Sequence, residues 1–125
     1  MLNDLSKRDA DILRHIIKYC DELEEAFQVF GNNEKTFLTN SVFKNAVSMP
    51  VQQIGELTKH LTDDFISDHS EVPWKEIKGM REWFAHNYWG MNPHVIWSTA
   101  TVDLPPLKRF CINALSEKND YTVPQ

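Results

Sequence analysis

Apolar residues recur at three- and four-residue steps along most of the chain, which is the spacing of one face of a helix. The first such stripe comprises Ile12, Ile16, Cys20, Leu23, Phe27 and Phe30. Ser6 is suited to cap this helix at its N-terminus, with Asp9 at the third helical position, and Gly31 is suited to end it. The pattern therefore predicts a long first helix that ends at Phe30.

A second helical region is predicted from about residue 41 to residue 61. Its expected inner face consists of Val42, Ala46, Met49, Gln53, Leu57 and Leu61. Pro50 interrupts this pattern, and because proline lacks a backbone N–H and clashes with the preceding turn, we expect a kink or a restart at Ser48. The polar and acidic stretch 62–72 is predicted to be a connection.

Three more helices are predicted in the second half of the chain. Pro73 suits the first turn of a helix over 74–88. Asn92 is expected to cap a short helix that runs through residue 102, and Asp103 to cap a last one that ends near residue 116, with two prolines in its first turn.

Strand signals are nearly absent, since no segment alternates apolar and polar residues for long. A chain of 125 residues with 42% hydrophobic residues is the size of one domain with one core. The expected fold is all-α, an up-and-down bundle of four or five helices in a single domain over 1–116. Residues 117–125 are expected to form a polar C-terminal tail.

Charge and composition narrow the function classes. The net charge of −5 argues against a protein that coats nucleic acid through bulk electrostatics, but it leaves room for a small local basic pocket. No apolar run approaches the roughly 20 residues needed to span a bilayer, and no signal peptide is visible, so we expect a cytoplasmic protein without membrane contact. Cys20 and Cys111 are expected to be small packing residues.

The most informative segment for chemistry is the helix over 74–88. At about 100° per residue, one narrow stripe contains Trp74, Ile77, Arg81, Phe84 and Tyr88. A cation inside an apolar stripe needs a buried partner or lines a cleft, because burying an unpaired guanidinium is costly. His86 lies about 140° from Arg81, in the last turn, where the helix dipole favours its charged form. Taken alone, such an Arg–His pair is more often structural than catalytic.

The wider pattern resembles the HepT-like branch of the HEPN superfamily, the toxin partners of minimal nucleotidyltransferases (MNT antitoxins). The family signature Arg-x4-His-x-Tyr matches Arg81, His86 and Tyr88. The resemblance covers roughly residues 9–115, and its specificity comes from the order and spacing of five runs: 54–57, 72–81, 86–90, 95–97 and 103–107.

The resemblance implies a homodimeric helical endoribonuclease that needs no metal or other cofactor and acts on RNA. Arg81 would then stabilise charge on the phosphoryl oxygens, and His86 would transfer protons. It also implies that Tyr88 accepts AMP from the nucleotidyltransferase partner, which would neutralise the toxin. Asn87 and Glu56 are candidates for supporting positions around the site. Glu82 departs from the family, which often has an uncharged polar residue or Asp directly after the arginine, and commonly Asn in this branch.

Two alternatives remain open at this point. The first is a non-catalytic helical dimer that binds the nucleotidyltransferase or its nucleotide, which Glu82 and the acidic net charge favour slightly. The second concerns Glu56, His60 and Asp64, whose i, i+4, i+8 spacing would suit metal ligands on one helix face, although a salt-bridging surface is the expected interpretation.

Overall fold

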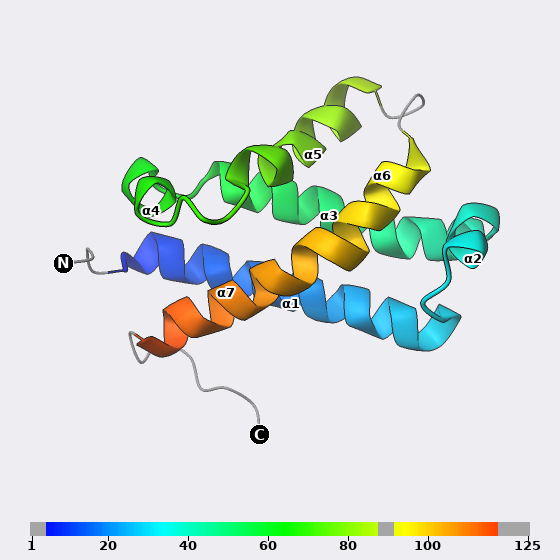
Figure 1. Ribbon diagram of the computed structural model, residues 1–125, viewed down its shortest axis with the longest axis horizontal. Coiled ribbons are helices and arrows are strands. Elements are labelled where there is room, and N and C mark those ends of the chain that lie inside the picture. The colour runs from blue at the N-terminus through cyan, green and yellow to red at the C-terminus, as the bar shows by residue number, and fades with distance from the viewer. Residues whose placement is uncertain (1–4, 88–91, 118–125) are drawn as a thin grey trace.

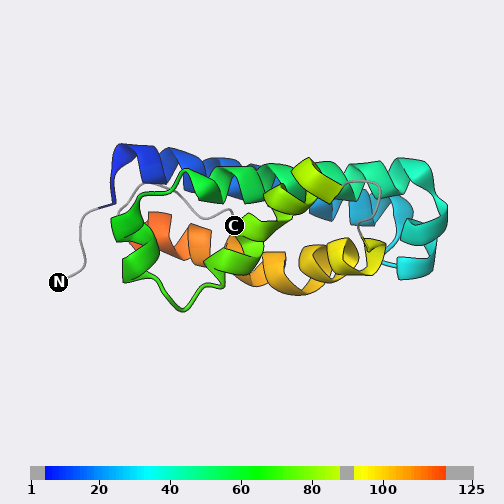
Figure 2. The same cartoon turned by 90° about the horizontal axis from the view of Figure 1, so that it is seen from above.

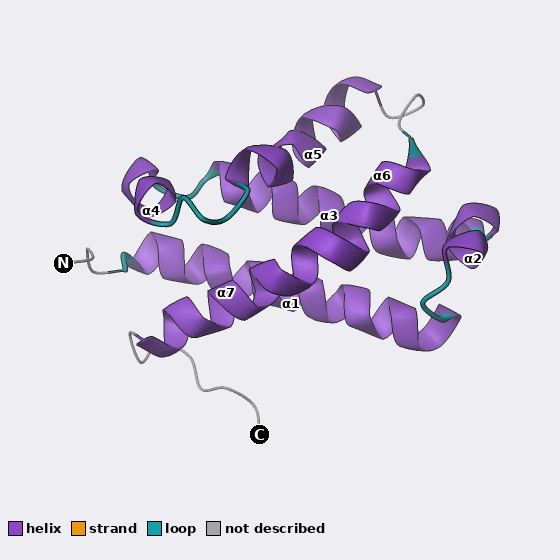
Figure 3. Ribbon diagram, in the orientation of Figure 1, coloured by secondary structure: helices purple, strands orange, loops and turns teal. Residues whose placement is uncertain are grey.

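The computed structural model describes residues 5–87 and 92–117, with side chains described up to Met80 and again from Asn92. Within these ranges the chain is helical and contains no strand (Figures 1 and 3). The elements are α1 (Lys7–Phe30), α2 (Glu34–Thr39), α3 (Ser41–Lys59), α4 (Asp63–Asp68), α5 (Trp74–Asn87), α6 (Pro93–Ser98), the π-helical segment η1 (Thr99–Asp103) and α7 (Leu104–Glu117). The prediction of an all-α fold is confirmed.

Four long helical units alternate in direction: α1, α3, α5 and the rod formed by α6, η1 and α7 (Figure 1). Helix α1 packs against both α3 and α7, and α5 packs against α3. Figure 2 shows α1 and α3 side by side in one layer and the α6–η1–α7 rod in a second. The predicted up-and-down bundle is therefore present. Helix α7 takes in Glu117, and the rest of the predicted tail lies outside the described residues.

Helix α1 has the predicted ends. The Ser6 hydroxyl accepts a hydrogen bond from the Asp9 amide at 3.0 Å. Gly31 follows the last turn with φ of 90°, a conformation that disfavours residues with a Cβ. The predicted stripe is buried from Ile12 to Leu23, and Phe27 and Phe30 pack against the core. Cys20 and Cys111 are buried free thiols, as expected for packing residues.

The predicted inner face of this region is confirmed only in part. Leu61, just after α3, is buried and Ala46 and Leu57 pack against the core, but the centre of the buried face is shifted by one residue. Val42 and Met49 are 64% and 56% exposed, whereas Phe43 is completely buried. The stripe that faces the core is Phe43, Val47, Val51, Ile54 and Thr58. Both stripes have helical spacing, and the structure buries the one that contains the phenylalanine and the β-branched residues, because it removes more apolar area from water.

Pro50 does not divide α3, so the predicted restart at Ser48 is not found. The helix runs unbroken from Ser41 to Lys59 and the proline ring is buried. A proline at this position loses one backbone hydrogen bond. Burial of Val47, Val51 and Ile54 on the same helix offsets that loss.

Two short helices were not predicted. Asn33 caps α2 by accepting from the Thr36 amide at 3.0 Å, and Thr62 caps α4 by accepting from the Phe65 amide at 3.2 Å. Each helix is shorter than two turns and buries a single phenylalanine. A single buried residue cannot establish a period, so these helices depend on their caps and on the core they cover.

The predicted cap at Asp103 is also wrong, since α6 continues through η1 into α7 without a break. Pro105 and Pro106 cannot donate to the carbonyls four residues earlier. The helix widens there into π geometry, in which the Leu104 amide donates to the carbonyl of Thr99. Asp103 therefore lies inside a continuous rod, and Asn92 caps that rod by accepting from the His94 amide at 2.9 Å.

A buried carboxylate ties α1 to α4. Asp9 is only 3% exposed, and it accepts hydrogen bonds from the Thr62 amide at 3.0 Å and from the Thr62 hydroxyl at 2.7 Å. Asp9→Asn replaces one accepting carboxylate oxygen with an NH₂ group, although the Thr62 amide and hydroxyl that face it are both donors. We expect it to lower the free energy of unfolding by about 1.5–3 kcal/mol in urea titrations, the range for hydrogen bonds to charged groups. Asp11→Asn, on the exposed side of the same turn, is the control and should change it by less than about 0.5 kcal/mol. Equal losses would contradict a structural role for Asp9.

Candidate functional site

Arg81 and His86 of the signature belong to α5, which is unbroken from Trp74 to Asn87. Trp74, Ile77 and Met80 are buried, so the first two turns of α5 face the core as the stripe predicts. Arg81 follows Ile77 by one turn, on the register of that stripe.

The remaining predicted residues can be placed only in part. His86 lies in the last turn of α5, with Glu82 before it and Asn87 after it. The side chains of Arg81, Glu82, His86 and Asn87 lie outside the described part of the structure, as does Tyr88 altogether. Their grouping into one site stays a prediction.

The start of α5 is held by an aromatic cluster. The Trp74 indole Nε1 donates to the backbone carbonyl of His69 at 2.9 Å. The Trp74 ring lies 5.8 Å from the ring of Phe110 in an edge-to-face arrangement and 6.1 Å from that of Phe65. These contacts join α5 to α4 and α7, so the helix that presents the signature is anchored at its N-terminal end.

The predicted support from α3 stays untested. Helix α3 packs along α5, and Ile54 and Gly55 are buried on α3. Glu56 is half-exposed, and its Oε1 lies 3.5 Å from the Nε2 of His60. This ion pair agrees with the interpretation of that surface as salt-bridging.

The metal-ligand alternative is not supported. His60 is the C-cap of α3, whereas Asp64 belongs to α4, so Glu56, His60 and Asp64 do not share a helix face. Among the side chains of residues 5–80 and 92–117, no group of three or more His, Cys, Asp or Glu could hold a metal ion. The chain turns at residues 60–62, which removes the periodic spacing on which that alternative depended.

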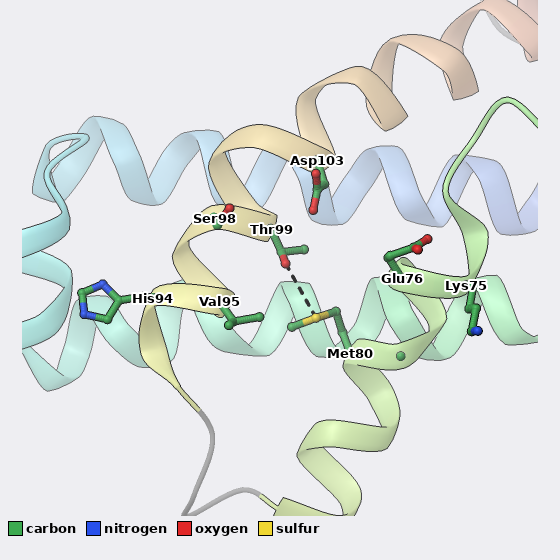
Figure 4. Close-up of a pocket in the computed structure, with 9 residues that line it drawn as sticks. Lys75, Glu76, Met80, His94, Val95, Ser98, Thr99 and Asp103 are labelled. Atoms are coloured by element: carbon green, nitrogen blue, oxygen red, sulfur yellow. Dashed lines mark hydrogen bonds between the residues drawn. The ribbon is translucent and has the colours of Figure 1, made fainter.

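A hollow of about 510 Å³ opens between α5 and the α6–η1 part of the rod (Figure 4). Gly79 and Met80 form part of its α5 wall, and Val95 and Thr99 face them from the rod. The Thr99 hydroxyl lies 3.7 Å from the sulfur of Met80, which joins the two walls. Because Gly79 and Met80 directly precede Arg81, the hollow lies beside the start of the signature segment. Sequence reasoning did not find it, since its walls come from segments about 20 residues apart.

The edge of this hollow is charged. Glu76 comes from α5 and Asp103 from η1 (Figure 4). Partial burial raises the pKa of Asp103 above its ordinary value, and the negative charge of Glu76 raises it further. Holding both carboxylates charged therefore disfavours the folded state at neutral pH.

Because the pKa of Asp103 is raised, we expect the Asp103→Asn variant to be more stable than the wild type, by an amount that depends on pH. The folded protein retains the Asp103 proton to higher pH than the unfolded chain, so the wild type loses stability as pH rises through that interval. The variant should unfold at a higher temperature than the wild type at pH 7, and the difference should shrink as the pH falls below about 4, where both states are protonated. Thermal melts at these two pH values are the measurement, and a gain of equal size at both would show that the charge is not its cause.

The part of the chain that the structure describes contains no helix that is both long and apolar enough to cross a bilayer.

The chain is similar to known proteins over most of its length. Residues 16–114 match the family described as "Ribonuclease HepT-like". "Putative RNase TTE0752" of Caldanaerobacter subterraneus is 38% identical over 97 residues, covering 78% of this chain and 85% of that protein. "Probable ribonuclease HepT" of Thermococcus cleftensis is 32% identical over 95 residues, covering 72% and 86%. "Putative RNase MJ1380" of Methanocaldococcus jannaschii is 30% identical over 106 residues, covering 84% and 95%.

No solved structure matches the chain. The family match spans α1 from Ile16 to most of α7 and includes the whole of α5. The extent of this match, together with the all-α bundle, shows that the chain belongs to the HepT-like ribonuclease family.

Proposed function

We propose that this protein is a metal-independent endoribonuclease, the toxin of a toxin–antitoxin pair, that cleaves RNA with Arg81 and His86. The observation that carries the proposal is the position of the signature. Both residues lie on one unbroken helix, anchored at Trp74, inside the family match. The names of the relatives, which describe RNases, support the same activity.

The chemistry needs only groups that the chain and RNA supply. His86 takes the proton of the RNA 2′-hydroxyl, whose oxygen then forms a bond to the adjacent phosphorus. The bond from phosphorus to the 5′-oxygen breaks, and an imidazolium returns a proton to that leaving oxygen. The products are a 2′,3′-cyclic phosphate and a 5′-hydroxyl. Imidazole suits both transfers because its ordinary pKa, about 6.5, is close to neutrality.

Arg81 supplies charge stabilisation in the same step. Negative charge grows on the phosphoryl oxygens as phosphorus becomes five-coordinate. A guanidinium offers a planar fork of N–H donors and stays charged at every working pH. Donors aimed at oxygens where charge develops lower the barrier more than they strengthen ground-state binding.

A two-fold dimer would complete the site. Arg81 and His86 are about 140° apart on an ideal helix, so one α5 does not direct both toward one point. Two copies of α5 across a shared cleft would supply two imidazoles, one as the base and one as the acid. The dimer would also bring each Arg81 close to a His86.

Control of the activity would act through Tyr88. A partner nucleotidyltransferase, the antitoxin, would transfer AMP from ATP to the tyrosine oxygen: a Tyr–O–P bond forms, the bond to pyrophosphate breaks, and the phenol loses its proton. The attached phosphate would carry negative charge near Arg81 and occupy the position that RNA phosphate needs.

The test is an RNA cleavage assay on protein produced without a nucleotidyltransferase, its unmodified mass verified first. Cleavage of single-stranded RNA should persist in EDTA and leave cyclic phosphate ends. A substrate with a 2′-deoxy sugar at the cleaved position should remain intact, because it lacks the nucleophile. No cleavage by unmodified protein would contradict the proposal and favour the non-catalytic dimer, which the net charge of −5 also suits.

The proposed role of Tyr88 has its own measurement. Co-expression with an active nucleotidyltransferase from the neighbouring reading frame should raise the mass of the protein by one or more AMP groups, with no increase in Tyr88→Phe. An unchanged mass would contradict the role of Tyr88 and leave the cleavage mechanism intact.

A further inference from the structure

We propose that the seam between α5 and the α6–η1–α7 rod is a docking groove for a cationic, amphipathic helix of another protein. We call this seam the acidic groove. Its edges include Glu71, Glu76, Asp103 and Glu117, and its floor includes Met80 and Phe110. The inference does not depend on the ribonuclease activity, since none of these residues belongs to the signature.

Three neighbouring hollows follow one another along the rod. The hollow beside Gly79 adjoins a second one of about 190 Å³, because Asp103 lines both. The second adjoins a third, of about 350 Å³, through Glu71 and Phe110. From Val95 to Glu117 the rod is about 30 Å long at 1.5 Å per residue. This length accommodates several turns of a bound helix.

Apolar surface lines the bottom of the groove. Met80 of α5 and Val95 of α6 lie at one end, and Leu107 and Phe110 of α7 lie farther along. Phe110 is only partly buried, although it packs on the rings of Phe65 and Trp74. An amphipathic helix fits such a floor because its apolar positions repeat every three or four residues.

The edges give the groove a negative charge. Carboxylates line all three hollows, on both sides of the seam: Asp68, Glu71, Glu76, Asp103 and Glu117. Among the side chains that the structure describes, fewer basic groups line the hollows. His69 lies 3.8 Å from Glu71 and His94 pairs with Glu34, and the one lysine among these lining residues is Lys75.

The repulsion between Glu76 and Asp103 favours a cationic occupant. A lysine or arginine of a partner between them would relieve that repulsion. RNA is disfavoured, because its phosphates would add negative charge along the same edges. A second copy of this seam is disfavoured as the occupant as well, because a two-fold contact there would set its own carboxylates against these.

The direct test is binding of a labelled helical peptide of leucine and lysine, about 14 residues long, to the full chain, followed by fluorescence anisotropy. The double variant Glu76→Gln/Asp103→Asn should weaken binding at least about fivefold. The matched control Glu22→Gln/Glu25→Gln removes the same charge from the exposed surface of α1 and should change affinity less than about twofold.

Gly79→Leu tests the apolar part separately. Gly79 lines the hollow, and a Cβ there would meet no atom within 4 Å, so the first atom of a new side chain has room. Helix propensity also favours leucine over glycine, so the variant should fold. We expect this variant to weaken peptide binding several-fold, because the leucine side chain fills part of the hollow.

Three results would overturn the proposal. One is equal weakening by the two double variants, which would indicate unspecific attraction to an acidic protein. Another is unchanged affinity in Gly79→Leu. The third is binding of a labelled single-stranded RNA oligonucleotide that Gly79→Leu weakens as much as it weakens the peptide, which would reassign the groove to nucleic acid. Because the readout is peptide binding, failure here is distinguishable from failure of the RNA cleavage assay.

Discussion

His86→Ala is expected to lower the rate of RNA cleavage by about 10²- to 10⁴-fold, the usual contribution of one group in general acid–base catalysis. The variant removes the proposed proton carrier, while the 2′-hydroxyl and Arg81 remain. His86 lies in the last turn of α5, far from the aromatic anchor at Trp74, so the fold should tolerate the change. The measurement is the single-turnover rate in EDTA, with equal unfolding temperatures as evidence of intact structure.

The matched control is His15→Ala. His15 lies on the exposed side of α1, and its Nδ1 is 2.8 Å from the carbonyl of Asp11. This variant should cleave RNA at the wild-type rate. Arg81→Ala should slow cleavage by about 10²- to 10³-fold, as does removal of one donor to a developing oxyanion in other enzymes. Wild-type rates in both His86→Ala and Arg81→Ala would exclude the signature as the catalytic centre.

Phe43→Ala is expected to lower the free energy of unfolding by about 3–5 kcal/mol, the range for large aromatic deletions in a core. Phe43 is completely buried. Its ring stacks on that of Phe30 at 4.9 Å and meets Phe37 and Trp97 edge-on at 5.9 and 5.8 Å. The truncation therefore leaves a cavity between α1, α2, α3 and α6. Urea titrations followed by circular dichroism measure the loss.

Val42→Ala is the control, because the neighbouring residue is 64% exposed. It should change the free energy of unfolding by less than about 0.5 kcal/mol, the usual range for surface positions. The pair tests which face of α3 is internal. A large loss in Val42→Ala with a small one in Phe43→Ala would restore the face that the spacing alone predicts.

The sequence predicts α1 almost completely, because its stripe is long and both of its ends carry local signals. Ser6 and Gly31 act on the backbone beside them, so no distant contact is needed to place the ends. Helix α3 shows the limit of this reasoning. Two stripes one residue apart have the same period, and only the positions of α1 and α5 decide which one is buried.

The candidate site, like the fold, is predicted by the sequence only in part. The order of the signature along one helix can be read from the sequence, because helical register follows from 3.6 residues per turn. The role of Asp9 could not be read, since its partner Thr62 is 53 residues away. The sequence does not predict the π geometry of η1. This geometry accommodates Pro105 and Pro106 within a packed rod, where breaking the helix would expose more apolar surface.

By itself, therefore, the sequence determined the all-α class, the ends of α1 and the positions of Arg81 and His86 along α5, because periodicity and capping act over a few residues. Tertiary structure alone decided which face of α3 is buried and where the acidic groove runs. These features depend on surfaces from helices far apart in the chain, and the burial of apolar area has no directional preference until those helices meet.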